Sequence, residues 1–217
     1  MRYILSLFLL LVSLQASTKD WQIISMPNIC TFKIPKTMEI QAGTYKKISD
    51  KFHVEVLELP IDSTRVLAQQ KDLNSYKKKA FKTYARVIVE TEYGRKGDYE
   101  KITTQLTATK FELRELGGIF RQDMEAELRK ISAKGKMKMK LISWFPVKLV
   151  EINGVSMIHL NYTRTVNDGP EALVNLFIVQ NDDRMHRITI SYRISNAYLY
   201  KDDLGKVINT FRFEKRR

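Results

Sequence analysis

The side chains in this sequence best suited to nucleophilic or general-base chemistry are three histidines, His53, His159 and His186, and a single cysteine, Cys30. All three histidines fall in segments predicted as strands, and no two of them stand at the spacing of metal ligands. The sequence also contains no Cys-x-x-Cys pair and no acidic calcium-binding loop. It therefore predicts neither a metal site nor a bound cofactor, and it offers no phosphate-binding glycine loop or serine-hydrolase motif.

Among these four residues, His159 is the candidate for a general base. It alternates in phase with Asn161 and Thr163 on the more polar side of its predicted strand, whereas His186 is in phase with two isoleucines and is expected at the core. Cys30 sits in an early predicted strand without a cysteine-hydrolase signature, and free cysteine is usually buried. A hydrolase with a site around His159 stays an alternative, since a base also needs a nucleophile and an orienting carboxylate.

Two groups of residues are instead suited to binding an acidic partner. The first is a predicted polar face of the sheet, formed by His159, Asn161, Arg187 and Arg193. The second is a lysine ridge in which Lys136, Lys138 and Lys140 alternate with apolar residues, so that a strand would present their ammonium groups on one side. Such lysines could dock an anionic lipid or glycan, or they could protect an exposed sheet edge from pairing with another chain.

The charge of the chain indicates either an acidic partner or simply a solvated basic surface. The chain carries 37 Lys and Arg against 24 Asp and Glu, a formal net charge of +13, which favours acidic partners over basic ones. No stretch carries a specific catalytic signature. We therefore expect a non-enzymatic binding or accessory protein that docks on an acidic partner or an anionic envelope component, and no nucleic acid is expected. The alternatives are the hydrolase around His159 and a carrier of an apolar ligand, which would require a cavity between sheet and helices.

The beginning of the chain predicts export. Met1-Arg2 is followed by an apolar run to Leu14 and then by Gln15-Ala16-Ser17, the pattern of a cleavable signal peptide over residues 1–17. Residues 18–217 are then a single mature domain, periplasmic or extracellular, without a further membrane-spanning segment. One cysteine cannot form an internal disulfide, so the core alone must hold this domain together.

The elements that must position these side chains are clearest in the last third of the chain. Asn153-Gly154 is a strong hairpin signal between strands over residues 147–152 and 155–166, and turns near residues 167–170 and 181–183 add strands over 173–180 and 185–194. The result is a four-stranded antiparallel meander. The strand from Leu173 is apolar on both sides, which indicates a central strand covered on both faces, and a short helix carrying Leu204 and Val207 follows.

Earlier segments are predicted from weaker patterns. Residues 21–59 indicate short strands, including an alternating run at Phe52, Val54 and Val56. Residues 63–143 form a mainly helical insertion: one helix is indicated from Tyr76 to residue 87 or 88, and residues 86–93 could end it as helix or as strand. A second helix begins at Thr109, where Thr-x-x-Glu resembles a capping box, and its glycine pair at residues 117–118 predicts a kink or two shorter helices.

The order of these elements resembles the PsbP-like superfamily. The residues that carry the resemblance are Ile34-Pro35 at the end of a strand, the Asn153-Gly154 hairpin, the strand over residues 187–192 and the closing segment 208–213. The resemblance covers both ends of the chain, while the middle is longer and more helical. It implies an α+β fold, an α/β/α sandwich in which helices pack on an antiparallel sheet, here with a helical insertion. Members are mostly non-enzymatic binding or assembly factors, and no binding residue of the family can be matched here.

Overall fold

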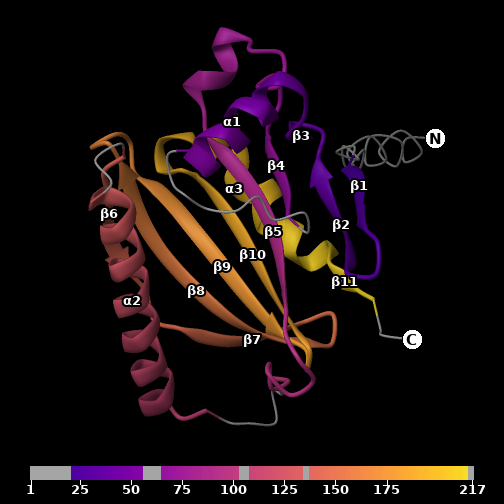
Figure 1. Cartoon of the computed structure of the whole chain (residues 1–217), viewed down its shortest axis with the longest axis vertical. Helices are drawn as coiled ribbons and strands as arrows, with labels where there is room; N and C mark the ends of the chain where they lie inside the picture. The colour runs from indigo at the N-terminus through magenta and orange to yellow at the C-terminus, as the bar shows by residue number, and fades with distance from the viewer. Residues whose placement is uncertain (1–20, 56–64, 103–107, 134–136, 215–217) are drawn as a thin grey trace, which may run out of the picture.

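The fold is α+β: a large antiparallel sheet with three α-helices, in a computed structural model that describes residues 21–55, 65–102, 108–133 and 137–214 (Figure 1). The small sheet contains β1 (Trp21–Met26), β2 (Cys30–Pro35) and β11 (Arg212–Phe213). The large sheet contains β3 (Met38–Ile40), β4 (Val66–Gln70), β5 (Ala85–Tyr93), β6 (Met139–Trp144), β7 (Lys148–Ile152), β8 (Val155–Val166), β9 (Ala172–Gln180) and β10 (Arg184–Arg193). The α-helices are α1 (Gly43–Glu55), α2 (Lys110–Ala133) and α3 (Ala197–Val207).

The strands of the large sheet follow the order β3-β4-β5-β10-β9-β8-β6, and β7 pairs with the part of β8 that β6 leaves free. The predicted meander is confirmed as β7 to β10. Asn153 and Gly154 both have positive φ values, +54° and +74°, as the predicted hairpin turn requires. The Asn153 amide also donates hydrogen bonds to the carbonyl oxygens of Asn209 and Phe211, so the hairpin tip holds the C-terminal segment in place.

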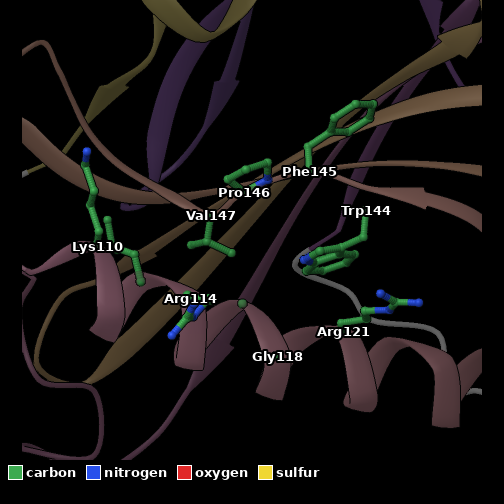
Figure 2. Close-up of a pocket in the computed structure, with 10 residues that line it drawn as sticks. Lys110, Arg114, Gly118, Arg121, Trp144, Phe145, Pro146 and Val147 are labelled. Carbon is green, nitrogen blue, oxygen red and sulfur yellow. The ribbon is translucent and has the colours of Figure 1, made fainter.

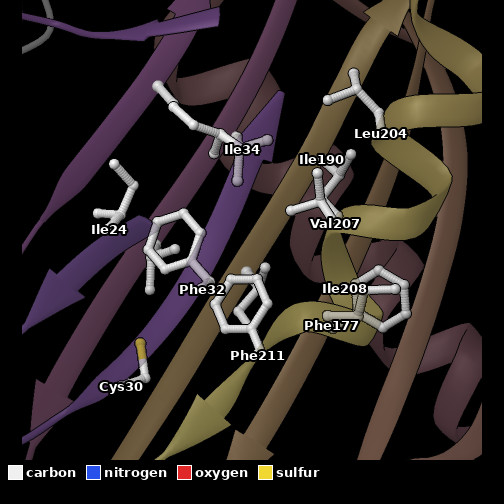
Figure 3. Close-up of a cluster of buried hydrophobic side chains, with 14 of the residues drawn as sticks. Ile24, Cys30, Phe32, Ile34, Phe177, Ile190, Leu204, Val207, Ile208 and Phe211 are labelled. Atoms are coloured by element: carbon white, nitrogen blue, oxygen red, sulfur yellow. The ribbon is translucent and has the colours of Figure 1, made fainter. Parts of the chain in front are cut away.

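The two faces of the large sheet are covered by different elements. On one face, the small sheet and α3 enclose the main core, where Phe32, Phe211 and Leu204 have at most 1% of their surface exposed (Figure 3). On the other face, Leu116 and Phe120 of α2 pack against a smaller cluster that includes Ile178 of β9. Phe177 lies in the main core and Ile178 in the smaller cluster. The prediction that β9 is central and covered on both faces is therefore confirmed.

The prediction of a helix from Tyr76 to residue 87 or 88 is wrong. A 3-10 turn over Lys78–Lys82 leads into strand β5, which settles the ambiguous residues 86–93 as strand. The reason is that Val87 and Val89 alternate into the main core with at most 1% exposure, while β5 pairs with both β4 and β10. The described part of residues 63–143 thus contains the predicted long helix α2, but it also supplies β4, β5 and β6 to the sheet.

Two further expectations are corrected. The alternating run at Phe52 and Val54 belongs to helix α1. The reason is that residues 45, 48 and 52 also follow helical spacing, and Lys46 forms an ion pair with Asp50 one turn later. Residues 56–57 of this run lie outside the described residues. The glycine pair does not divide α2, which is a single helix of 24 residues. The signal peptide over residues 1–17 also lies outside the described residues.

Candidate functional site

The predicted polar face does not bring its four residues together. In the register of the sheet, His159 lies opposite Phe177, and Phe177 lies opposite Ile188. Because side chains alternate along each strand, His159 and Asn161 share the main-core face with Ile188, whereas Arg187 and Arg193 point to the opposite face, toward the α2 side. The sequence showed the alternation within each strand but not the register between strands, and the grouping of these four residues is therefore wrong.

His159 lies in an environment that suits a structural role. Its ring stacks on Phe177 with centroids 4.4 Å apart, and its Nε2 lies 3.0 Å from the Asn175 amide oxygen, which also accepts a hydrogen bond from Asn161. Burial lowers the pKa of His159 below its ordinary value, although the hydrogen bond with Asn175 opposes this shift. Its hydrogen-bond partner is an amide rather than the carboxylate that would orient a general base, so this geometry gives the hydrolase alternative no support.

Two of the other candidates for nucleophile and general base, Cys30 and His186, are buried. Cys30 has no exposed surface, and burial raises the pKa of its thiol to about 12, which keeps the thiolate population negligible at neutral pH. His186 is 2% exposed and its Nδ1 lies 3.0 Å from the Thr91 hydroxyl. The side chain of His53 is outside the described residues. Within the described part of the chain, no three His, Cys, Asp or Glu residues gather as a metal site.

The lysine ridge is partly neutralised by a carboxylate. Lys138 and Lys140 contact the two carboxylate oxygens of Asp168 at 3.0 and 2.8 Å, and Lys136 lies outside the described residues. Their strand β6 is at the end of the large sheet. This position is where lysines protect an edge from pairing with other chains, which was one of the two interpretations of this segment.

A pocket of about 620 Å³ lies between the first half of α2 and the connection from β6 to β7 (Figure 2). Its volume is within the range of small-molecule binding sites. Most of the wall is apolar, and all of the ionisable residues that line it are cationic. The lining residues are Lys110, Leu113, Arg114, Gly117, Gly118 and Arg121 of α2, together with Trp144, Phe145, Pro146 and Val147.

The glycine pair explains how α2 approaches the sheet while leaving this space open. A Cβ atom on Gly117 would lie 3.2 Å from the Val147 side chain, which is closer than ordinary packing allows. A Cβ atom on Gly118 would meet nothing within 4 Å, because this residue faces the open pocket (Figure 2). Each glycine destabilises a helix interior by about 1 kcal/mol relative to alanine. Close packing accounts for Gly117, whereas Gly118 contributes space to the pocket.

The apolar wall is held in a fixed position by its neighbours. Trp144 stacks on Tyr162 of β8 with ring centroids 5.7 Å apart, and Val147 is only 4% exposed. Phe145 is 42% exposed and lies on the same connection. Figure 2 shows the Phe145 ring directed away from α2, so Trp144 and Val147 form the apolar surface that faces the pocket.

The cationic side of the pocket follows from the start of α2. Arg121 contacts Glu125 at 2.9 Å, whereas the guanidinium of Arg114 lies over the ring of Phe111 at 5.5 Å. Lys110 is the first residue of the helix, where the helix dipole already adds positive potential. A lysine at this position is unfavourable for the helix itself, and it makes the mouth of the pocket attractive to an anion.

The predicted capping box fixes the position of Lys110 and Arg114. The Glu112 carboxylate accepts hydrogen bonds from the amide and the hydroxyl of Thr109 at 2.6 and 2.8 Å, and the Glu112 amide donates to the Thr109 hydroxyl at 3.2 Å. These hydrogen bonds hold the pKa of Glu112 below its ordinary value. The start of α2 at Lys110 confirms the prediction made from Thr-x-x-Glu.

Replacing Thr109 by alanine should therefore lower the free energy of unfolding by about 1 kcal/mol, the usual effect of losing an N-cap hydroxyl. Urea unfolding followed by far-UV circular dichroism measures this change. Thr109→Ser, which keeps the hydroxyl, is the matched control and should stay within about 0.5 kcal/mol of the wild type. Equal losses in both variants would contradict a capping role.

No protein-family model and no curated protein matches this chain. Among solved structures, it is similar to the solution structure of cyanobacterial PsbP (CyanoP) from Synechocystis sp. PCC 6803, with 13% identity and a TM-score of 0.48 over 92% of this chain and 96% of that chain.

Two other solved structures come from bacteria. One, from Bacteroides thetaiotaomicron VPI-5482, has 9% identity and a TM-score of 0.44, and the match covers 86% of this chain and 46% of that chain. The other is a Pseudomonas aeruginosa protein of unknown function, PA94, described as a putative regulator, with 10% identity and a TM-score of 0.36 over 91% of this chain and 97% of that chain. All three likenesses concern the fold alone.

Proposed function

We propose that this chain is a non-enzymatic binding protein for an acidic amphiphile, a molecule with an apolar body and a negatively charged group. The observation that carries the proposal is the α2 pocket, which combines an apolar wall with cationic residues at its mouth. The apolar body would lie against Trp144 and Val147, and the acidic group would lie beside Lys110 and Arg114. This arrangement joins two expectations from the sequence, an acidic partner and an apolar ligand.

The apolar body and the acidic group of such a ligand would contribute differently to binding. Burying apolar ligand surface contributes about 25 cal/mol per Å² before the cost of association is subtracted. The cations at the pocket mouth are solvent-exposed, so they add selectivity for acidic ligands more than affinity. A ligand without a charge should consequently still bind, though more weakly.

Dodecanoate is a suitable probe, and Trp144 is a built-in reporter. The chain has two tryptophans, Trp21 and Trp144, and Trp21 lies on β1 of the small sheet. In a Trp21→Phe background, titration with dodecanoate below its micellar concentration should therefore shift the emission of Trp144 in a saturable manner. Dodecanol, which lacks the carboxylate, should bind about tenfold more weakly. Unchanged Trp144 emission throughout both titrations would refute the proposal.

Filling the pocket should abolish this binding. Gly118→Leu places a branched side chain into the open space of the α2 pocket and should weaken dodecanoate binding by at least about tenfold. Gly118→Ala is the matched control, because it adds one methyl group and should stabilise α2 by about 1 kcal/mol while leaving most of the space free. If the leucine variant bound dodecanoate as well as the alanine variant, the ligand would have to lie elsewhere.

The charge preference is tested separately. The Lys110→Gln/Arg114→Gln double variant should lose most of the preference for dodecanoate over dodecanol while keeping the affinity for dodecanol. Lys101→Gln/Arg129→Gln removes the same charge from exposed positions that do not line the pocket and should keep the preference. The same loss in both double variants would show that net charge, rather than the pocket mouth, selects the acidic ligand.

The proposed setting of this activity is outside the cytosol. The N-terminal pattern over residues 1–17 supports export, and none of the described helices is both long and apolar enough to cross a membrane. Residues 18–217 would then act in the periplasm or the medium, where an acidic amphiphile or an anionic envelope component is available. The mass of the chain recovered from the exporting cell tests this point, since removal of the signal peptide leaves a chain that begins near Thr18.

A further inference from the structure

A second group of cations lies on the α2 face of the large sheet, apart from the pocket. Arg164 of β8 is opposite Ala172 of β9, and Ala172 is opposite Arg193 of β10. The Arg193 amide donates a hydrogen bond to the carbonyl oxygen of Tyr84, which places Tyr84 at the end of the same row. Arg86 follows two residues later and therefore points to the same face. The sheet thus gathers three arginines at one end of this face.

The row from Arg164 to Tyr84 is short enough for their side chains to meet. Neighbouring strands are about 4.8 Å apart, so Arg164 and Tyr84 are separated by about 14 Å along the row, a span that two long side chains can bridge. Ala172 and Arg193 lie between them in this row, and Ser191 lies opposite Arg86 in the neighbouring row. The Tyr84 hydroxyl lies 3.2 Å from the Ser191 hydroxyl, and the guanidinium of Arg86 lies 5.3 Å from the centre of the Tyr84 ring.

The guanidinium groups of Arg86 and Arg164 lack anionic partners among the described residues. The Nε atom of each is buried and makes no hydrogen bond there. Arg86 lies over the Tyr84 ring, while Arg164 contacts the Met139 sulfur at 3.8 Å and hydrogen-bonds with the Tyr84 hydroxyl. A buried donor on a cation is costly when it has no acceptor, so this arrangement is suited to receiving one.

The Tyr84 hydroxyl reports the positive potential at this point. Burial on its own would raise the pKa of Tyr84, but the charges of Arg86 and Arg164, together with the hydrogen bonds with Ser191 and Arg164, hold its pKa below the ordinary value. The direction of this shift agrees with the geometry. Two cations therefore act on the same hydroxyl group, at a place where an anion would experience both charges.

We propose that Arg86 and Arg164, together with the hydroxyl groups of Tyr84 and Ser191, form a binding site for a doubly charged tetrahedral oxyanion: phosphate or the phosphate group of a monoester. Two guanidiniums balance two negative charges. Their forked donors and the two hydroxyl groups approach from different strands, which fits an anion with several acceptor oxygens better than a planar carboxylate. This site does not depend on the proposed function of the α2 pocket.

Inorganic phosphate is the probe for the first test, which uses the whole mature chain. Isothermal titration with phosphate, at an ionic strength held constant with chloride, should give saturable binding to the wild type. The Arg86→Gln/Arg164→Gln double variant should lose at least about tenfold in affinity. Arg187→Gln is the matched control, because Arg187 lies on the same face but contacts Glu92 at 3.3 Å; its phosphate affinity should stay within about twofold of the wild type.

The thermal unfolding midpoint, measured with phosphate or chloride, tests the site in the wild type and the single variants, and so does not require the double variant to fold well. Phosphate should raise the thermal midpoint of the wild type more than chloride at the same ionic strength, and each single variant, Arg86→Gln or Arg164→Gln, should reduce that difference. Equal effects of phosphate and chloride on the wild type would overturn the site. A loss in Arg187→Gln as large as in the double variant would also overturn it, since net charge would then explain the binding.

Two further arms identify the source of the phosphate group and separate this site from the pocket. Dihexanoyl phosphatidic acid that binds about tenfold more tightly than inorganic phosphate would identify a lipid headgroup, whereas similar affinities would identify a soluble phosphate. Gly118→Leu, which fills the α2 pocket, should leave phosphate binding unchanged. Loss of phosphate binding in this variant would contradict a site at Arg86 and Arg164.

Discussion

Replacing Phe211 by alanine should lower the free energy of unfolding by about 3–5 kcal/mol, the range for removing a large aromatic side chain from a close-packed core. Phe211 is 1% exposed and stacks face to face on Phe32 of β2, with ring centroids 4.6 Å apart (Figure 3). Its carbonyl oxygen also accepts a hydrogen bond from the Asn153 amide at the hairpin tip. The substitution therefore loosens the contact by which the C-terminal segment joins the two sheets.

Urea unfolding followed by circular dichroism measures this loss. Phe111→Ala is the matched control, because Phe111 is 57% exposed at the start of α2, and its removal should change the free energy of unfolding by about 0.5 kcal/mol or less. Similar unfolding midpoints for the two variants would show that the Phe32–Phe211 contact does not hold the sheets together.

Local sequence signals predicted the fold best where they specify backbone geometry directly. Asn153-Gly154 supplies the two residues that tolerate positive φ, and the turn forms where the pair stands. Thr109 and Glu112 satisfy each other's backbone amides, and the helix begins between them. Such signals depend on a few neighbouring residues, so the rest of the chain has little power to override them.

Patterns that fit two periods could not be resolved from the sequence alone. Residues 76–84 repeat at three- and four-residue spacing, but the following residues alternate with period two, and pairing with β4 and β10 decides for strand β5. The opposite happens at Phe52, where a short alternation lies within helix α1. Long-range pairing and packing decide such segments, and neither is visible in a local window.

The candidate sites show the same limit. Alternation correctly placed His159 in phase with Asn161, and Arg187 in phase with Arg193, but only the register across β8, β9 and β10 shows that the two pairs face opposite ways. The α2 pocket joins residues 110–121 to residues 144–147, a contact that no local pattern indicates. Its one signal in the sequence was the glycine pair, which we interpreted as a helix interruption and which instead provides close packing at Gly117 and space at Gly118.

Acid should destabilise the protein through His186 by as much as about 3 kcal/mol between pH 6.5 and pH 4. Burial, with a smaller effect of the Arg184 charge, lowers the pKa of His186 to about 4, while an unfolded chain has a histidine pKa of about 6.5. The folded state thus binds fewer protons than the unfolded state in this interval. The neutral ring stabilises the fold fully above pH 6.5, and that contribution is lost progressively as the pH falls toward 4.

The matched variant for this test is His186→Asn, whose amide can still hydrogen-bond with the Thr91 hydroxyl but does not titrate. The variant will be less stable at pH 7 because it leaves space beside Phe213, and this cost should not depend on pH. Carboxylates and His159 titrate alike in both proteins, so the difference in free energy of unfolding between wild type and variant isolates His186. That difference should shrink by about 3 kcal/mol from pH 7 to pH 4. A difference that stayed constant, or a His186 ring that titrated near pH 6.5 by NMR, would mean that the ring accepts a proton without leaving the core.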